Sequence, residues 1–352
     1  MRYLDQWMEE LKQCAATNIH WSLIDGKSFF ITGATGGIGK YLVALLLFRN
    51  EYFNGNIRIT ITGRSEEKYK RRFADILQMF SAADSLEFLE QDLMQPLNEG
   101  IRSDYIIHLA SNTHPRLYAQ DPIGTEMTNI LGTYHLLKSM RTGSRFFFGS
   151  SGDIYGDNRS DKLYIDENDC GYINCNTLRA GYIEGKRAGE ALCQAFKEAE
   201  HINFVIGRLC RAYGHTMQLE DSKAISQFVL KAVKQEDVVL KSAGNQIFSY
   251  LHIADIVRAI LVILTDGTNG EAYNIADKNQ AVSLKKLAET LADISGNKVV
   301  MEVPDQQEQK GASDFQSVIL NSEKLENIGW KPLYQLKEGL LSTVDMLRLK
   351  IQ

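Results

Sequence analysis

The sequence predicts an α/β fold in which a doubly wound parallel sheet, covered by helices on both faces, is joined to a smaller mixed α/β C-terminal lobe. Two observations predict this fold. Apolar runs typical of buried strands alternate with helical patterns through the first 214 residues. In the first of these units a glycine-rich turn, TGATGGIGK at residues 32–40, follows an apolar run and opens an apolar helical stretch.

The chain begins with apolar residues at positions 4, 7, 8 and 11, a helical spacing that predicts an amphipathic helix. We expect it to pack on the body of the protein, with packing on a partner subunit as the alternative. Strands of the parallel sheet are expected, with helices between them, at residues 28–32, 57–62, 86–90, 105–109, 145–148 and 204–208. After residue 214 the elements become shorter and mixed. Helices are expected there at 224–234, 256–264, 284–294 and 336–349, and strands at 238–241 and 272–275.

The glycine turn is suited to the phosphates of a dinucleotide. Gly33 permits the tight turn, Gly36 lets the backbone approach a pyrophosphate, and Gly39 lets the helix pack close to the strand. The helix N-terminus adds free N–H groups and the positive end of its dipole. A glycine-rich turn without a ligand is the alternative interpretation.

These patterns predict three regions. We expect a helical extension at residues 1–26, a dinucleotide-binding Rossmann-type domain at residues 27–214, and a substrate-binding lobe at residues 215–352 that is interleaved with the domain before it. The polar segment DQQEQKGASD, residues 305–314, is expected to be a mobile loop.

The composition argues against several other classes of function. Of the 352 residues 44% are hydrophobic and 24% charged, and a net charge of −5 provides no attraction for nucleic acid or an anionic membrane. The five cysteines lack metal-ligand spacing, so we expect no metal, and their odd number predicts reduced thiols and a cytoplasmic location. No apolar run approaches about 18 residues, and no signal-peptide core is recognisable.

Tyr182 and Lys186 are spaced by four residues in a helical stretch, which places both side chains on one face. A nearby ammonium favours a phenolate, so we expect the pKa of Tyr182 to fall from about 10 toward the working range. Such a group can take a proton from a sugar hydroxyl. An ordinary pair on a helix surface is the alternative, but the preceding glycine turn and the strand-like run at 145–151 favour catalysis.

Six motifs recur in one known family. They are TGATGGIGK at 32–40, HLAS at 108–111, SSGDIYG at 150–156, Tyr182 with Lys186, RLCRAYG at 208–214 and LHIAD at 251–255. Through them the chain, from residue 27 to residue 349, resembles the extended short-chain dehydrogenase/reductases (the NAD-dependent epimerase/dehydratase family), which are sugar-nucleotide epimerases, dehydratases and decarboxylases. The stretches 108–133 and 176–196 look most like UDP-glucuronate decarboxylases.

The resemblance implies a bound nicotinamide cofactor. An acid after the second strand would hold the ribose of NAD, but this chain has Arg64 there, which can pair with the 2′-phosphate of NADP or stack on adenine. We expect NAD by family habit, with NADP as the alternative. Asp92 resembles the residue that touches adenine, or else caps a turn. The other implied cofactor-binding residues are Gly33, Thr35, Gly36, Gly37, Ile38, Gly39, Leu93, Leu109, Ala110, Ser111, Tyr182 and Lys186.

The resemblance also implies a catalytic group made of Tyr182, Lys186, Ser151 and Asp153. Ser151 would bond the reacting oxygen, and Asp153 stands where UDP-glucuronate decarboxylases carry a glutamate, unless it only caps local backbone N–H groups. Dehydratases carry an Asp-Glu pair at positions 152 and 153. Because Gly152 lacks the acid that would protonate a departing hydroxyl, 4,6-dehydration is disfavoured. Decarboxylation needs no such acid, since oxidation at C4 creates a β-keto acid.

The substrate lobe departs from its relatives at three positions. Phe248 stands where they carry an arginine, Arg211 where they carry an asparagine, and His215 where they carry a proline. Arginine is the natural bidentate partner of a diphosphate, so we expect Arg211 or Lys223 to replace it, unless the substrate is not a standard UDP-sugar. His215 is interpreted as a loop residue. Asn112 is also expected to bind substrate.

We therefore expect a nucleotide-sugar enzyme that acts through a 4-keto intermediate, with decarboxylation of UDP-glucuronate or a related uronic acid as the first hypothesis. Epimerisation of a nucleotide sugar through the same intermediate is the second. A third, a cofactor-binding structural or regulatory protein without turnover, is disfavoured by the presence of Ser151, Tyr182 and Lys186. We expect a homodimer with no nucleic-acid or membrane partner.

Overall fold

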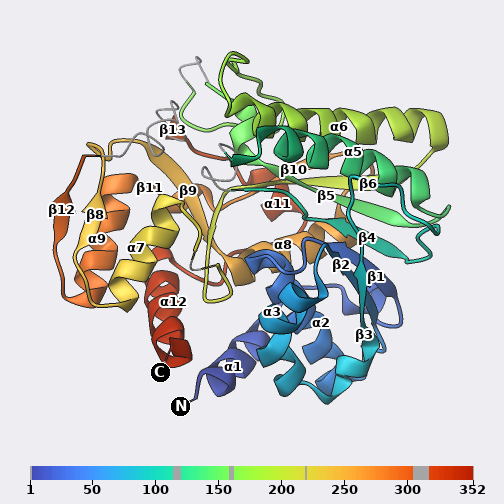
Figure 1. Ribbon diagram of the computed structural model, residues 1–352, viewed down its shortest axis with the longest axis horizontal. Helices are drawn as coiled ribbons and strands as arrows, with labels where there is room; N and C mark the ends of the chain where they lie inside the picture. Colours follow the sequence, from blue (N-terminus) through green and yellow to red (C-terminus); the bar gives the residue numbers. More distant parts are fainter. Residues whose placement is uncertain (1, 114–119, 158–161, 219, 304–316, 352) are drawn as a thin grey trace.

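A computed structural model describes residues 2–113, 120–157, 162–218, 220–303 and 317–351 (Figure 1). The segment 305–314, expected to be a mobile loop, lies outside the described residues. No helix in the described part of the chain is both long enough and apolar enough to cross a membrane.

A parallel sheet of seven strands forms the centre of the fold, in the order β10-β6-β5-β4-β1-β2-β3. The strand order reverses between β1 and β4, and in such sheets ligands bind at the carboxyl ends of the strands beside the reversal. The predicted α/β fold is thus confirmed. The strands are β1 (Ser28–Thr32), β2 (Arg58–Gly63), β3 (Leu86–Glu90), β4 (Tyr105–His108), β5 (Arg145–Ser151), β6 (Asn203–Leu209) and β10 (Ala272–Ile275).

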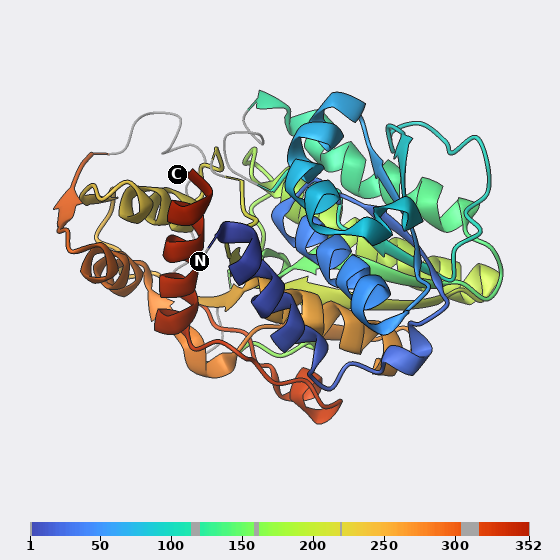
Figure 2. The same cartoon turned by 90° about the horizontal axis from the view of Figure 1, so that it is seen from below.

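Helices cover both faces of this sheet (Figures 1 and 2). One face carries α5 (Pro122–Ser139) and α6 (Ala180–Glu200), and the other carries α2 (Gly37–Phe53), α3 (Glu66–Met79) and α8 (Ile253–Asp266). Because successive strand residues point to opposite faces, Phe146 and Phe148 pack beneath α5 and α6 while Phe147 packs on the other side. A strand with apolar residues on both faces therefore reads as a continuous apolar run.

The second lobe consists of two small sheets and the helices packed on them. One sheet has the order β11-β9-β13, with β7 also paired to β9, and the other pairs β12 with β8. Its strands are β7 (Arg211–Tyr213), β8 (Val238–Leu240), β9 (Ile247–His252), β11 (Ala281–Ser283), β12 (Val299–Met301) and β13 (Ser317–Val318). Its helices are α7 (Ala224–Val233), α9 (Leu284–Ser295) and α12 (Leu336–Ile351), with the short α11 (Glu323–Asn327) beside β10.

The chain passes between the two parts more than once. Both α8 and β10 lie beyond residue 214, yet α8 packs on the central sheet and β10 forms its edge beside β6. The strand expected at 272–275 therefore exists, but it belongs to the central sheet. Within the described residues, short 3-10 helices lie at η1 (Trp21–Leu23), η2 (Ser81–Ser85), η3 (Gly152–Tyr155) and η4 (Lys278–Gln280).

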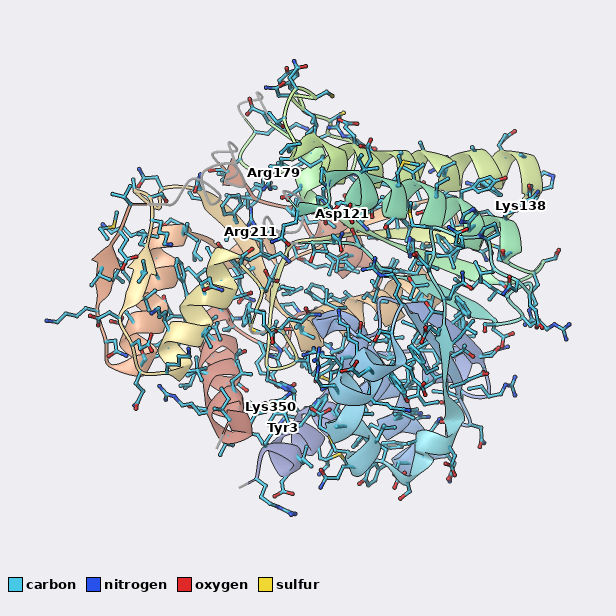
Figure 3. All side chains as sticks on the ribbon, in the orientation of Figure 1. Tyr3, Asp121, Lys138, Arg179, Arg211 and Lys350 are labelled. Atoms are coloured by element: carbon cyan, nitrogen blue, oxygen red, sulfur yellow. The ribbon has the colours of Figure 1, made fainter. Side chains whose placement is uncertain are left out.

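The expected N-terminal helix, α1 (Tyr3–Ala15), is present and lies between α2 and α12, where the two chain ends meet (Figures 1 and 2). The inner face of α1 contacts a buried histidine from the turn after β7. This residue, His215, is 1% exposed, with Nδ1 3.0 Å from the Tyr3 hydroxyl and Nε2 3.2 Å from the Glu10 carboxylate, both on α1. His215 lies in the turn after β7, so it is a loop residue as interpreted, and its buried side chain joins that loop to α1. The Lys350 ammonium of α12 donates to the same Tyr3 hydroxyl at 3.3 Å (Figure 3).

Candidate active site

A pocket of about 530 Å³ lies at the carboxyl ends of β1, β4 and β5, beside the second lobe. Every residue that the sequence analysis assigned to the cofactor, to catalysis or to the substrate lines this pocket. Their roles stay predictions, but the fold does bring the residues together. Within the described parts of the chain, no group of three or more His, Cys, Asp or Glu is arranged to hold a metal ion.

The glycine turn has the shape that a dinucleotide needs. Gly33 has a φ of +73°, and a Cβ there would lie 2.5 Å from the backbone of Leu109. A Cβ on Gly39 would lie 2.6 Å from the Cα of Ala34, so only glycine lets the helix approach the turn so closely. Gly36 precedes the first residue of α2, which opens toward the pocket. This cradle fits a pyrophosphate at the helix N-terminus.

An arginine that the sequence analysis overlooked fixes the turn. The Arg72 guanidinium donates to the carbonyl of Thr35 at 3.1 Å and to the carbonyl of Thr216 at 2.9 Å. It thereby ties the glycine turn to the loop that follows β7. Its position on the helix after the second strand was visible in the sequence, but nothing local shows that it reaches two distant loops.

The end of the pocket where the sequence analysis expects the adenosine half of the cofactor is cationic. Arg64 is exposed at the end of β2, and Lys68 lines the pocket one helical turn into α3. Burial, and then the nearby Arg64, lower the pKa of Lys68. The Asp92 carboxylate accepts a hydrogen bond from the backbone N–H of Met94 at 3.0 Å, the turn-capping contact considered as its alternative role. Asp92 also lines the pocket, so both roles are open to it.

Tyr182 and Lys186 lie four residues apart on α6, and both line the pocket. The Lys186 ammonium donates to the carbonyl of Gly149 at 2.6 Å and lies over the ring of Phe148. Burial lowers the pKa of Lys186 to about 7.

The expectation that Lys186 lowers the pKa of Tyr182 is wrong for this structure. Burial, and next the carboxylate of Asp153, raise the pKa of Tyr182 to about 12. A hydrogen bond with Ser151 and the charges of two arginines act in the opposite direction but do not outweigh them. The phenol is only 7% exposed, so loss of hydration is the dominant cause.

Asp153 forms an ion pair that the sequence analysis missed. The Arg179 guanidinium donates to its carboxylate at 2.9 Å, and the two side chains are only 14% and 20% exposed. Although burial raises the pKa of Asp153, Arg179, followed by Arg211 and Lys223, holds it below its usual value. Asp153 is therefore a carboxylate at neutral pH. The available signal was the position of Arg179, three residues before Tyr182 at the start of α6.

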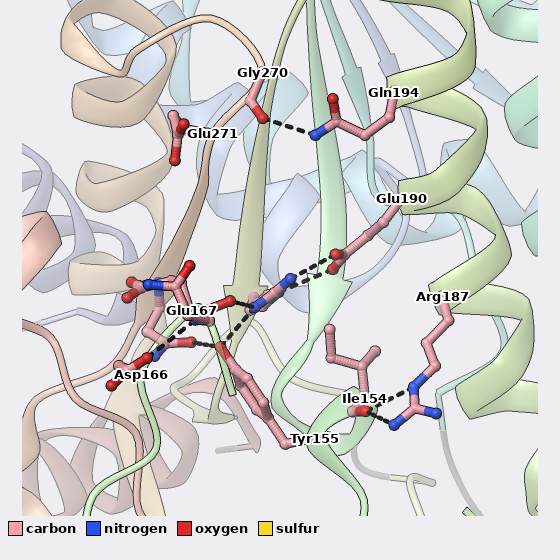
Figure 4. Close-up of polar contacts among 12 residues, drawn as sticks. Ile154, Tyr155, Asp166, Glu167, Arg187, Glu190, Gln194, Gly270 and Glu271 are labelled. Atoms are coloured by element: carbon pink, nitrogen blue, oxygen red, sulfur yellow. Dashed lines mark hydrogen bonds and ion pairs between the residues drawn. The ribbon is translucent and has the colours of Figure 1, made fainter. Parts of the chain in front are cut away.

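The turn that carries Ser151 and Asp153 is held from behind by α6. The Arg187 guanidinium donates to the carbonyl of Ile154 at 2.6 and 2.9 Å and to the carbonyl of Gly171 at 2.9 Å (Figure 4). The helix that carries Tyr182 thus also fixes the turn that carries Ser151 and Asp153.

A second arginine extends this support to the edge of the sheet. Arg208 of β6 pairs with Glu190 of α6 at 2.8 and 3.1 Å and donates to the hydroxyl of Tyr155 at 2.9 Å (Figure 4). That hydroxyl donates to Asn274 of β10 at 2.6 Å. Because these groups are buried and mutually satisfied, they fix the relative positions of β6, α6 and the turn after β5.

The substrate wall of the pocket contains two of the proposed cations. Arg211 of β7 lies with its guanidinium carbon 3.7 Å from the centre of the Phe248 ring. The Lys223 ammonium donates to the Thr113 hydroxyl at 3.1 Å and lies 3.5 Å from the Asp221 carboxylate.

The loop after β4 also lines the pocket. It contains Leu109, Ala110, Ser111 and Asn112, all of which line the pocket. The Asn112 amide donates to the Thr125 hydroxyl of α5 at 3.0 Å, so this side chain is anchored to the helix.

Comparison with known proteins agrees with this geometry. The family model described as "NAD dependent epimerase/dehydratase family" matches residues 29–276. UDP-glucuronic acid decarboxylase 3 of Arabidopsis thaliana is 28% identical over 326 residues, covering 91% of this chain and 89% of that protein. UDP-glucuronic acid decarboxylase 1 of Xenopus tropicalis is 25% identical over 331 residues, covering 93% and 74%.

Solved structures show the same fold. A UDP-glucose 4-epimerase of Thermotoga maritima, solved with UDP-glucose, has a TM-score of 0.75 and 22% identity, covering 92% of this chain and all of that one. A dTDP-glucose 4,6-dehydratase of Streptomyces venezuelae, solved with NAD bound, also has a TM-score of 0.75 and 22% identity, covering 91% and 97%.

Proposed function

Because the chain belongs to the NAD dependent epimerase/dehydratase family, we propose that it is an NAD-dependent enzyme that decarboxylates UDP-glucuronate or a related nucleotide uronic acid. One observation carries the proposal. Ser151, Tyr182 and Lys186 lie in the same pocket as the glycine cradle, so a sugar held there can meet both the tyrosine and the cofactor.

The residues present fit NAD, the cofactor that the family's description names. The cradle of the glycine turn and the N-terminus of α2 suit the pyrophosphate, and the loop after β4 would border the nicotinamide half. When bound, NAD supplies the oxidising equivalent for C4 of the sugar and can return it.

Tyr182 is the proposed base that takes the proton of the C4 hydroxyl. Since burial and Asp153 oppose ionisation of the phenol, the groups that favour phenolate determine how easily it reacts. These groups are the hydrogen bond with Ser151 and the positive charges of Arg179 and Arg211. Arg179 contributes twice, because it also neutralises Asp153.

Oxidation at C4 places a ketone β to the uronate carboxylate. The C5–C6 bond then breaks, CO2 leaves, and the electron pair moves onto the C4 oxygen as an enolate. Tyr182, protonated in the first step, and Ser151 line the same pocket and would donate hydrogen bonds to that oxygen. A proton added at C5 gives a 4-keto pentose, and return of the hydride to C4 would give the hydroxyl sugar and restore the oxidised cofactor.

Dehydration does not suit this site. Asp153 is ionised by its pairing with Arg179 and has no proton to give to a departing hydroxyl. At Gly152 a Cβ would already lie 3.0 Å from the side chain of Leu320, so the place of the missing acid is filled by an apolar side chain.

Epimerisation of a nucleotide sugar is the second candidate, because it needs the same tyrosine and the same 4-keto intermediate. A UDP-glucose 4-epimerase has the same fold, and this similarity supports epimerisation as the second candidate. Mass spectrometry of products from UDP-glucuronate and UDP-glucose separates the two. Loss of CO2 supports decarboxylation, whereas an unchanged mass with altered proton couplings supports epimerisation. No turnover of any nucleotide sugar by NAD-loaded protein would point to a non-enzymatic role.

We also propose a cytoplasmic homodimer. The helix α5 exposes Ile123 (75%) and Tyr134 (41%) on the outer face of the molecule, an apolar surface that a second copy would cover. Light scattering during size-exclusion chromatography measures the mass, and a monomer at micromolar concentration would reject the dimer. Fractionation of cells tests the location.

A further inference from the structure

Besides Lys186, the cations Arg179, Arg211 and Lys223 lie around the end of the pocket that contains Tyr182, and two of these three have carboxylate partners. Arg179 pairs with Asp153, and Lys223 lies beside Asp221. The guanidinium of Arg211 differs: across residues 2–113, 120–157, 162–218, 220–303 and 317–351, no acidic side chain forms an ion pair with it. Its recorded contact is with the face of the Phe248 ring.

Strand register places Arg211 at the reacting end of the pocket. Ser151, the last residue of β5, is paired with Leu209 of β6, and Arg211 follows two residues later. Arg211 and Phe248 form one wall of the pocket that also contains Ser151 and Tyr182. Figure 3 shows Arg211 near Arg179, where the second lobe meets the helix layer of α5 and α6. The positive charge of Arg211 also acts on both Asp153 and Tyr182.

The Arg211 guanidinium carbon lies 3.7 Å from the centre of the Phe248 ring, close enough for a cation–π contact. An arginine stacked on an aromatic face keeps its N–H groups free along its edge, where they match a carboxylate. A half-buried cation has lost part of its hydration, so it favours a ligand that brings an anion. The pair therefore forms an anion site that neither residue would make alone.

A nucleotide uronic acid carries two anionic groups, a carboxylate and a diphosphate, and their positions on the sugar ring indicate which one would lie beside Arg211. The C4 hydroxyl must lie at Tyr182, and the carboxylate of a uronic acid is attached to the neighbouring ring carbon, C5. The diphosphate is attached to C1, across the ring. A cation beside Tyr182 is therefore nearer to the carboxylate than to the diphosphate.

We propose that Arg211, stacked on Phe248, binds the carboxylate of the uronic acid and selects acidic over neutral nucleotide sugars. This inference rests on the proposed function and deepens it. It also revises the expectation that Arg211 replaces a diphosphate-binding arginine, a role that is left to Lys223.

The proposal has a kinetic consequence. During decarboxylation negative charge leaves the carboxylate and accumulates on the C4 oxygen. Arg211 thus holds the ground state at least as strongly as the transition state, and its replacement is expected to raise KM more than it lowers kcat.

Binding is best measured in a Tyr182→Phe background, which prevents turnover during calorimetry. The ligands are UDP, UDP-glucose and UDP-glucuronate, each added to NAD-loaded protein. Arg211→Gln is expected to weaken UDP-glucuronate about 10–100-fold, because a charge-assisted contact is lost. UDP and UDP-glucose are expected to change by less than about twofold. Arg211→Lys retains the charge and should keep part of the preference, which guards against a folding defect.

Lys223→Met is the matched control, because it removes a cation from the same wall of the pocket. It is expected to weaken all three ligands by similar factors. An equal loss of UDP and UDP-glucuronate in Arg211→Gln would overturn the proposal, as would no loss of either. These binding measurements do not depend on turnover. If the enzyme with Tyr182 intact releases no CO2 from UDP-glucuronate, the proposed function is rejected, but the binding data still test the role of Arg211.

Discussion

The ion pair between Arg179 and Asp153 allows a quantitative prediction. Removing one partner of a buried pair costs about 3–5 kcal/mol, because the remaining charge is left without compensation. Asp153 keeps 20% exposure and the fields of Arg211 and Lys223, so we expect Arg179→Met to lower the free energy of unfolding by about 2 kcal/mol. With an entropy of unfolding of about 2.1 cal/mol/K per residue, a chain of 352 residues then loses about 3 °C in Tm.

A double-mutant cycle isolates this pair. Chemical denaturation of wild type, Arg179→Met, Asp153→Asn and the double variant should show a coupling free energy of about 2 kcal/mol. The matched control is Lys138 with Glu200, a pair at 3.1 Å whose side chains are 58% and 44% exposed. Exposed pairs contribute about 0.2–1 kcal/mol, so a coupling at Asp153 no larger than the control would refute the reasoning.

The stabilisation by the Arg179–Asp153 pair is also expected to depend on pH. Arg179 holds the pKa of Asp153 below its ordinary value, so the stabilisation is complete above about pH 3.9, the pKa of an unfolded aspartate. It is lost as the pH falls through the lowered folded value. The difference in Tm between wild type and Arg179→Met should therefore be constant from pH 6 to 8 and shrink only in strong acid. A difference that shrinks near neutral pH would assign the effect to another group.

Three further changes test the cofactor and the base. Tyr182→Phe should reduce turnover about 10²–10⁴-fold while NAD affinity stays the same, and near-normal turnover would remove Tyr182 from the mechanism. Gly36→Val should weaken NAD, measured by calorimetry, more than it lowers Tm, because the side chain would enter the phosphate cradle; an unchanged affinity would contradict the cradle. If Arg64 grips a 2′-phosphate, NADP should bind about 10–150-fold more tightly than NAD, and Arg64→Ala should abolish the preference. Equal affinities before and after that change would reduce Arg64 to a partner of adenine.

Local patterns were sufficient for the elements of the central sheet and for the cofactor end of the pocket. The Phe-Phe-Phe run of β5 reads as a strand because both of its faces are buried, and Gly33 is needed where φ is positive. The strand at 272–275 was found but misplaced, since an edge strand of a parallel sheet and a strand of a separate lobe look alike along the chain. The strands β7, β11 and β13, of two or three residues each, are too short to show a period.

The sequence by itself determined which residues are candidates for the chemistry: the glycine turn, Ser151, Tyr182 and Lys186, which the fold brings into one pocket. Only the tertiary structure decided how these groups are charged and which neighbours they meet. Burial and Asp153 raise the pKa of Tyr182, and the Arg211 guanidinium lies against the Phe248 ring. Hydration and Coulomb interactions depend on distances between segments that lie far apart in the sequence, and periodicity along one segment does not contain those distances.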